Sequence, residues 1–357
     1  MTQFYEPFKP STFVCKPAAA LIITKGGEIE VVSQNCSLPI ATFPKFAGSG
    51  RTSNLMDEEL LILGNDYLGT SARYFSIQKP RDGLLAMKYT VQDIPLTHSP
   101  HEHSSLVSGN TLTVVGGKFK SRGKLSKFTW TEHFLRWRNG THYTPYLAAA
   151  CSVKLDRDVH IIIGGERTID GQQISVSEVV KINTTEEIVD ELNPITNRRV
   201  SHDCQLVNRN IILVSGGLVE KKGAPSDVLP DELYNVTSQE VIEVLSANKS
   251  LGRFQHNLAK IGDKIWAVGG KDSKNVTLSQ IADFDSFTNS WESLTQKLHS
   301  TNTSELVTTS FPAASLDCVP QCQCGLPNME DRIFGGSVAQ VSIVGMDVHS
   351  ITSSLPG

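Results

Sequence analysis

Short apolar runs of strand length recur along the chain, and most of them end in a pair of glycines. Four runs have the full pattern, and they lead into Gly116–Gly117, Gly164–Gly165, Gly216–Gly217 and Gly269–Gly270. Nearly all their residues are β-branched or aliphatic, as expected for strands that are covered on both faces. Recurrence about every 50 residues indicates a repeat architecture in which each repeat is one small sheet.

The polar residues around each run predict the other strands of the repeat. A first strand that often opens with histidine precedes the run, as at His103, His202 and His256. A tight polar turn joins these two strands. Two outer strands follow a variable loop, and one such pair leads from Phe284 to Trp291. No segment has a long apolar period of 3.6 residues, so helix is expected to be scarce.

Incomplete copies of the repeat occur at both ends of the chain. Gly64 ends an imperfect copy, and the run before Gly26–Gly27 lacks a first strand. Residues 305–310 form a predicted strand with no glycine pair after it. Joining the two terminal pieces completes one sheet and removes exposed sheet edges. We therefore predict an all-β ring of six four-stranded antiparallel sheets, closed by N- and C-terminal strands, with five or seven sheets as the alternatives.

A unit of four strands with this glycine pair resembles a blade of the kelch-repeat β-propellers. The resemblance implies that the glycine pairs and Trp291 are structural blade residues. We expect an N-terminal extension over 1–17, a propeller over 18–316 and a cysteine-containing, poorly ordered tail over 317–357. Loops between the strands are expected to bind partners because they vary while the scaffold is rigid. The charged loop Leu218–Glu232, with its two prolines, is the best candidate contact.

Composition excludes several classes of partner. The chain has 357 residues, a formal net charge of −4 and a pI near 6.2, with no basic stripe of the kind that binds nucleic acid. It contains no apolar run of about 18 residues, so no membrane span is predicted. No cofactor, metal or catalytic residue is assigned. The partners that remain are an unknown protein or glycan.

Cysteines and glycosylation sequons point to the extracellular space. Residues 1–17 do not resemble a signal peptide, so the secreted start of the chain is expected to be missing. Seven cysteines leave at least one thiol without an intrachain partner; disulfides are favoured over zinc, and their connectivity is open. The alternative is that a β protein rich in Ser, Thr and Asn makes sequons by chance. The seven sequons begin at Asn35, Asn139, Asn183, Asn235, Asn248, Asn275 and Asn302.

The tail resembles the activation junction of trypsin-like serine proteases. Cys324-Gly325 leads to Arg332-Ile333, with Gly335-Gly336 and Ala339 beyond. The resemblance implies cleavage between Arg332 and Ile333 by an activating trypsin-like protease, and a bridge from Cys324 to a catalytic domain. The catalytic segments of that family are absent from this sequence. A truncated protease zymogen is therefore an alternative function, with a secreted, non-catalytic interaction module as the main prediction.

Two enzyme hypotheses rest on smaller clusters. His101 and His103 would lie on one face of a strand and could bind a metal, although His103 also occupies the recurring strand-opening position. Tyr143 and Tyr146 lie near Cys151 in the sequence, as a copper-radical oxidase of this blade type would require. The structural role is the preferred interpretation of the histidines, and a metal-dependent propeller oxidase is the third functional hypothesis.

Overall fold

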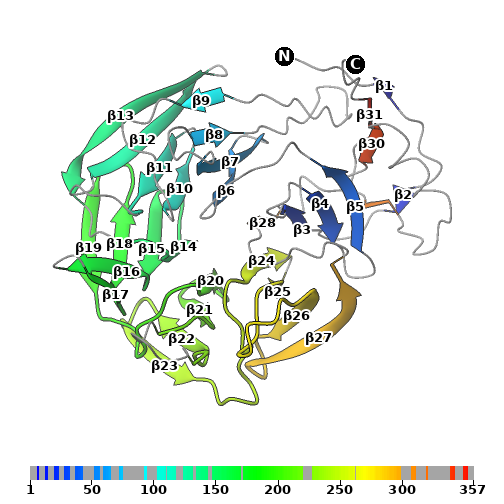
Figure 1. Cartoon of the computed structure of the whole chain (residues 1–357). Helices are drawn as coiled ribbons and strands as arrows, with labels where there is room; N and C mark the ends of the chain where they lie inside the picture. Colours follow the sequence, from blue (N-terminus) through cyan, green and yellow to red (C-terminus); the bar gives the residue numbers. More distant parts are fainter. Residues whose placement is uncertain are drawn as a thin grey trace.

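A computed structural model shows six four-stranded antiparallel sheets arranged in a ring, within the part of the chain that it describes (Figure 1). The first strand of each sheet faces the centre and the fourth lies at the outer edge, as from β10 to β13. The prediction of an all-β propeller is confirmed. Side chains are described over 103–109, 111–117, 147–167, 169, 172–219, 227–260, 263–295 and 298, and the other strands named below as backbone only.

The blades are numbered along the chain. Blade 1 is β28 (Val307–Ser310), β3 (Ala20–Ile23), β4 (Glu28–Val32) and β5 (Ser37–Thr42). Blade 2 is β6 (Thr52–Met56), β7 (Glu59–Asn65), β8 (Ala72–Tyr74) and β9 (Gln92–Ile94). Blade 3 is β10 (Ser104–Ser108), β11 (Thr111–Val115), β12 (Lys124–Thr131) and β13 (Phe134–Tyr143).

The other three blades carry most of the described side chains. Blade 4 is β14 (Cys151–Lys154), β15 (Val159–Ile163), β18 (Val179–Asn183) and β19 (Ile188–Leu192). Blade 5 is β20 (Asp203–Leu206), β21 (Ile211–Ser215), β22 (Glu232–Asn235) and β23 (Glu240–Val244). Blade 6 is β24 (Asn257–Ile261), β25 (Lys264–Val268), β26 (Gln280–Asp285) and β27 (Ser290–Lys297).

Blade 1 is shared between the two ends of the chain. Strand β28 pairs with β3, with Val307 opposite Ile23 and Ser310 opposite Ala20. This pairing closes the ring as expected from the two incomplete repeats. It also covers the edge of β3, which would otherwise be free to pair with another chain.

Smaller pairings also join the two ends of the chain. Strand β2 (Phe13–Val14) pairs with β29 (Val319–Pro320). Strands β1 (Glu6–Pro7), β31 (His349–Thr352) and β30 (Val338–Val341) form a three-stranded sheet. The expected N-terminal extension and tail therefore pair with each other, which the sequence analysis did not predict. The domain limits stay predictions.

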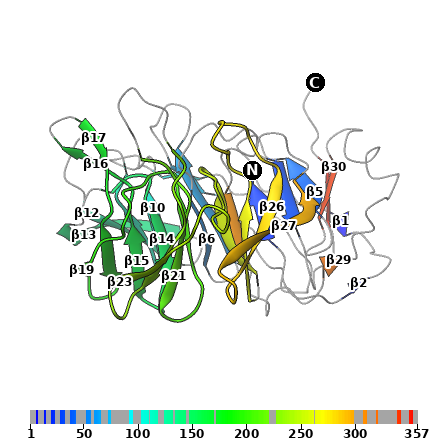
Figure 2. The same ribbon diagram turned by 90° about the horizontal axis from the view of Figure 1, so that it is seen from below.

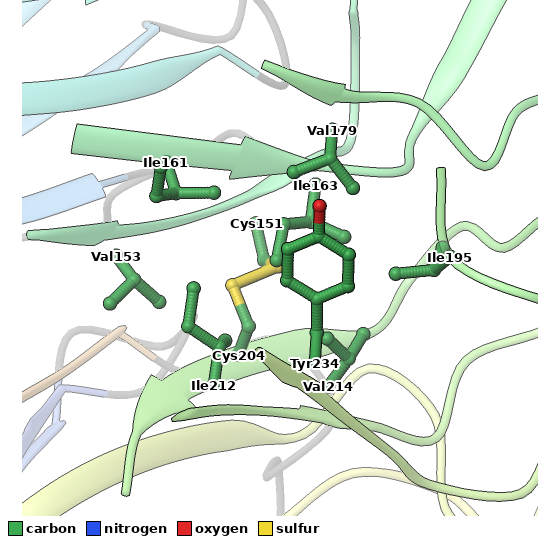
Figure 3. Packing of buried hydrophobic residues seen from close by; sticks show 10 residues of the cluster. All are labelled: Cys151, Val153, Ile161, Ile163, Val179, Ile195, Cys204, Ile212, Val214 and Tyr234. Atoms are coloured by element: carbon green, nitrogen blue, oxygen red, sulfur yellow. A yellow bond between two sulfur atoms is a disulfide. The ribbon is translucent and has the colours of Figure 1, made fainter. Parts of the chain in front are cut away.

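The core lies between neighbouring blades. On β15, Ile161 and Ile163 pack toward blade 5, whereas Ile162 packs toward blade 3, and all three are buried. Figure 3 shows the blade 4–5 cluster, with Tyr234 and the Cys151–Cys204 disulfide at its centre. An inner strand with a blade on each side needs apolar residues on both faces. This is why the sequence has uninterrupted apolar runs instead of alternating ones.

Blade 4 carries an additional hairpin. Strands β16 (Glu166–Ile169) and β17 (Gln172–Ser175) pair with each other, and the blade itself continues from β15 to β18. Figure 2 shows the hairpin extending beyond the strands of the blade. It follows Gly164–Gly165, so it belongs to the end of the blade at which the glycine pair lies, called here the glycine end. Within the described ranges, no helix could span a membrane.

Candidate interaction surface

In blades 3, 4 and 5 the glycine pair joins its blade to the loop that leads into the next one. The second glycine donates its backbone N–H across the blade boundary, from Gly117 to Leu147 O (3.0 Å) and from Gly217 to Arg253 O (3.0 Å). The first glycine of blade 5, Gly216, has a φ of 58°, and a Cβ there would lie 1.9 Å from Arg253 O. Glycine is needed because the backbone of the next blade occupies the place of a side chain.

The remaining predicted glycines are placed differently. Gly64 lies within β7, opposite Arg73 of β8, and β7 continues to Asn65. Gly26 and Gly27 lie outside the described residues. The second glycines of the other complete pairs, Gly165 and Gly270, have φ values of 96° and 89°, close to the 88° of Gly217.

A buried arginine braces the glycine end of blade 5. Arg199 donates to Gly216 O (2.8 Å) and Pro230 O (3.1 Å), and it forms an ion pair with the fully buried Glu232. Burial lowers the pKa of Arg199, while the Glu232 carboxylate opposes that change. Glu232 also accepts hydrogen bonds from Thr196 N (2.8 Å) and Asn197 N (3.1 Å). These bonds hold the backbone of the loop between blades 4 and 5 in place.

Blade 6 repeats this arginine. Arg253 donates to Gly269 O (3.3 Å) and Gln280 O (2.7 Å), and burial lowers its pKa to about 10. Neither arginine was among the predicted site residues. The signal was present, because Arg199 and Arg253 each stand three residues before a strand-opening histidine.

Breaking the ion pair with Glu232→Gln is expected to cost about 3 kcal/mol of unfolding free energy, because Arg199 would remain charged in a buried site without a compensating carboxylate. Urea unfolding of both proteins measures the difference. Glu240→Gln on the exposed side of β23 is the control and should change stability by less than about 0.5 kcal/mol. Equal stability of the two variants would contradict a structural role for the pair.

A second buried carboxylate connects blade 5 to blade 6. Asp231 accepts from Ser215 Oγ (3.1 Å), Gly216 N (2.7 Å), Leu251 N (3.0 Å) and Trp291 Nε1 (2.6 Å). Burial raises the pKa of Asp231, and these hydrogen bonds oppose the rise. Trp291 therefore lies at the boundary between two blades.

The predicted contact loop Leu218–Glu232 ends in two buried structural carboxylates, so its acidic end is not available to a partner; residues 220–226 lie outside the described residues.

The strand-opening histidines lie between blades. His202 Nε2 makes a hydrogen bond with Ile163 O of blade 4 (2.9 Å), and His256 occupies the equivalent position in blade 6. His103 is also buried. Among the described residues, no group of three metal-binding side chains occurs. His101, the other half of the predicted metal pair, lies outside them.

Buried histidines make the fold sensitive to acid. Burial lowers the pKa of His202 and of His256 to about 3 and that of His160 to about 4. The unfolded chain binds these protons near pH 6.5, so each histidine is expected to remove about 1.4 kcal/mol of stability per pH unit below that value. Asp203 acts in the opposite direction, because burial raises its pKa to about 7 and the folded state takes up its proton first.

We expect a net loss of at most about 3 kcal/mol per pH unit between pH 6 and pH 4, because three histidines are opposed by Asp203 and, in the same direction, by the raised pKa values of Asp231 and Glu178. Urea midpoints measured from pH 7.5 to pH 4.5 test this. Asp203→Asn removes one of the opposing carboxyl groups, so stability should fall more steeply with decreasing pH in that variant. A weaker dependence of stability on pH in that variant would show that Asp203 does not stabilise the folded state in acid.

The inner strands carry a third kind of connection. Ser104 Oγ donates to Ala150 O (3.3 Å), Cys151 forms a disulfide with Cys204, and Asp203 Oδ2 accepts from Leu258 N (2.6 Å). Ser104, Cys151 and Asp203 hold equivalent positions, each opposite the last residue before a glycine pair. The disulfide therefore occupies a place where the neighbouring boundaries have hydrogen bonds.

This disulfide removes the cysteine on which the copper-radical hypothesis rests. Cys151 is bonded to Cys204, so it is not available as the partner cysteine that the hypothesis requires. Tyr143 is described only as backbone at the end of β13, and Tyr146 lies outside the described residues. The other five cysteines are also outside them.

The predicted glycosylation sites differ in their surroundings. Asn183 and Asn235 cap equivalent turns, in which each side-chain oxygen accepts from the backbone N–H two residues later (3.1 and 2.9 Å). Asn248 and Asn275 are exposed near the glycine ends of blades 5 and 6. Turn chemistry alone favours asparagine at the first two positions. Asn139 lies in β13, described as backbone only, and Asn35 and Asn302 lie outside the described residues.

The tail junction is not among the described residues. Arg332 and Ile333 both fall outside them, so the protease-like cleavage stays a prediction.

Comparison with known proteins supports the propeller. Human Kelch-like protein 24 is 33% identical over 131 residues, which are 36% of this chain and 20% of that relative. The solved structure of YjhT superposes with a TM-score of 0.58 at 13% identity, covering 80% of this chain and 99% of the other. No family model matches the chain. The chain is thus similar to a kelch-like protein over part of its length and shares a fold with a propeller.

Proposed function

We propose that this chain is a non-catalytic, protein-binding propeller of the extracellular space, and that its contact surface is formed by loops at the glycine ends of the blades. The β16–β17 hairpin carries this proposal. It is an addition to a blade that is already complete, and it extends beyond the ring (Figure 2). Ile169 near its tip is 46% exposed, and Gln172 and Gln173 beside it are exposed. Aromatic or aliphatic side chains among polar neighbours are typical of binding loops.

Several buried groups argue against catalysis at the glycine ends. The Asp231 and Glu232 carboxylates each accept hydrogen bonds from three or more structural donors. Arg199 is paired with Glu232 and with backbone carbonyls. A catalytic acid or base must instead be able to reach a substrate. These groups are better explained as structural contacts that hold the blades and their loops in a rigid arrangement.

The disulfide supports the extracellular part of the proposal. Cys151 and Cys204 are buried and bonded, and such bonds persist in oxidising compartments. The exposed sequon residues Asn248 and Asn275 would be accessible to glycans. Intact mass measurement before and after glycosidase treatment of protein from a secretory host tests this. Absence of glycan, together with a free Cys151 thiol, would contradict secretion.

The hairpin can be tested with one matched pair of variants. Ile169→Ser removes the exposed apolar side chain of the hairpin, whereas Ile188→Ser makes the same change on β19 at nearly equal exposure (46% and 47%). Labelled protein is applied to arrays of purified extracellular protein domains and of glycans. We expect binding to a protein that Ile169→Ser weakens at least about tenfold and Ile188→Ser does not. Binding only to glycans, or equal loss in both variants, would reject the proposed surface.

A further inference from the structure

The turn between β26 and β27 lies at the outer edge of blade 6 (Figure 1). Phe287 in this turn is 94% exposed, more than any other large apolar side chain among the described residues. A single exposed apolar residue is ordinary on a protein surface. This one is unusual because of how firmly its backbone is held.

Hydrogen bonds within the turn fix its conformation. Asp285 Oδ1 accepts from Phe287 N (2.8 Å), and Asp285 Oδ2 accepts from Thr288 Oγ1 (2.8 Å). Thr288 Oγ1 is also within 2.8 Å of Ser290 Oγ. Asn289 closes the turn with a φ of 50°. The backbone that carries Phe287 is therefore ordered before any partner arrives, which lowers the entropic cost of binding.

Blade 5 holds the same turn from outside. Asn289 Nδ2 donates to Glu243 Oε2 of β23 (2.8 Å). Lys249, in the loop between blades 5 and 6, donates from Nζ to Thr288 O (3.2 Å). The turn that carries Phe287 is thus held from blade 5 as well as from its own blade.

Equivalent turns show that the fold does not require phenylalanine. In blades 4 and 5 the capping residues are Asn183 and Asn235, and the residue in the place of Phe287 is Thr185 or Thr237. Both threonines donate the same backbone N–H to the capping oxygen, at 3.1 and 2.9 Å. The cap forms the turn, so the exposed ring at position 287 has no structural task.

The turn that carries Phe287 has two acidic groups on it. Asp285 begins the turn, and Glu243 on the neighbouring strand β23 hydrogen-bonds to it, whereas Lys249 is the base that contacts it. Lys264, close to Asp285, is already paired with Asp283. The surface around Phe287 therefore has an excess of negative charge, which attracts basic groups and repels anionic lipid.

We propose that Phe287 and the acidic side chains around it form a docking surface for a partner protein that offers an apolar pocket bordered by lysine or arginine. The ring enters the pocket as a buried anchor, and Asp285 and Glu243 face the basic border. This surface lies on blade 6 and is separate from the β16–β17 hairpin of blade 4, so the two proposals can fail independently.

Photo-crosslinking at the turn tests the proposal. The full chain with Phe287→p-benzoylphenylalanine is irradiated in extract of its source tissue, and Thr185→p-benzoylphenylalanine, in the equivalent turn of blade 4, is the control. We expect a protein adduct that is specific to position 287, with the cross-linked residue inside an apolar pocket next to lysine or arginine. An adduct with lipid, with a second copy of this chain, or at equal yield in the control would overturn the proposal.

Two variants then test the contacts with the purified partner. Phe287→Thr copies the equivalent turns, so it should fold normally and bind at least about tenfold more weakly. Asp285→Asn keeps the cap, as Asn183 and Asn235 do, but removes the charge, so binding should weaken several-fold and lose part of its salt dependence. Affinities within twofold of the wild type for both variants would also overturn the proposal.

Discussion

Replacing Gly216 with alanine is expected to destabilise the protein by more than about 4 kcal/mol, a loss comparable to the total stability of many domains. The new Cβ would lie 1.9 Å from Arg253 O and 3.0 Å from Arg253 C. Both atoms belong to the backbone, so no side chain can rotate away. The boundary between blades 5 and 6 would have to separate, and with it the hydrogen bond from Gly217 N to Arg253 O.

A matched glycine isolates this steric effect from backbone strain. Gly252 has a φ of 66°, close to the 58° of Gly216, but no atom lies within 4 Å of a Cβ placed there. Gly252→Ala should therefore cost only the left-handed backbone penalty of about 1–2 kcal/mol. Thermal and urea unfolding of both variants give the comparison. Similar losses would mean that the glycine pair serves conformation alone and not the close approach of two blades.

Removing the Cys151–Cys204 disulfide is the second large effect. The bond closes a loop of 53 residues between the inner strands of blades 4 and 5. Loop-closure entropy for that length corresponds to about 4 kcal/mol of stability. The double variant Cys151→Ser with Cys204→Ala is expected to unfold at a correspondingly lower urea concentration.

Reductant provides the control for that measurement. Dithiothreitol should lower the stability of the wild type toward that of the double variant and should affect the double variant much less. The five other cysteines are unchanged in both proteins, so the difference between them reports this bond. A double variant that is as stable as the oxidised wild type would show that the boundary is held by packing alone.

Local sequence patterns were sufficient to predict the ring. The run Ile161–Ile163 is apolar on both faces because a blade packs on each side, and this short-range pattern repeats in every complete copy. Ring closure followed from two incomplete copies, residues 21–27 and 305–310, whose strands pair as β3 and β28. Such features depend on neighbouring residues and on the need to bury a sheet edge, so they can be recognised without coordinates.

The candidate surface depended on contacts that no local pattern contains. The acidic end of the loop Leu218–Glu232 had the composition of an exposed contact, yet Asp231 and Glu232 are buried against Trp291 and Arg199. The exposure of Phe287 could not be predicted from the sequence either, because its turn is capped in nearly the same way as two turns that have threonine at the equivalent position.

By itself, the sequence determined the repeat, the all-β blades and the joint closure of the ring by both ends of the chain, because strand and turn preferences act over a few residues. Only the tertiary structure decided which charges are buried, which cysteines are bonded and which side chains remain in solvent. Those outcomes are set where one blade meets the next, between residues such as Cys151 and Cys204 that are 53 positions apart. Partners at that separation are chosen by the packing of whole sheets, and burial then determines what each charge or ring can do.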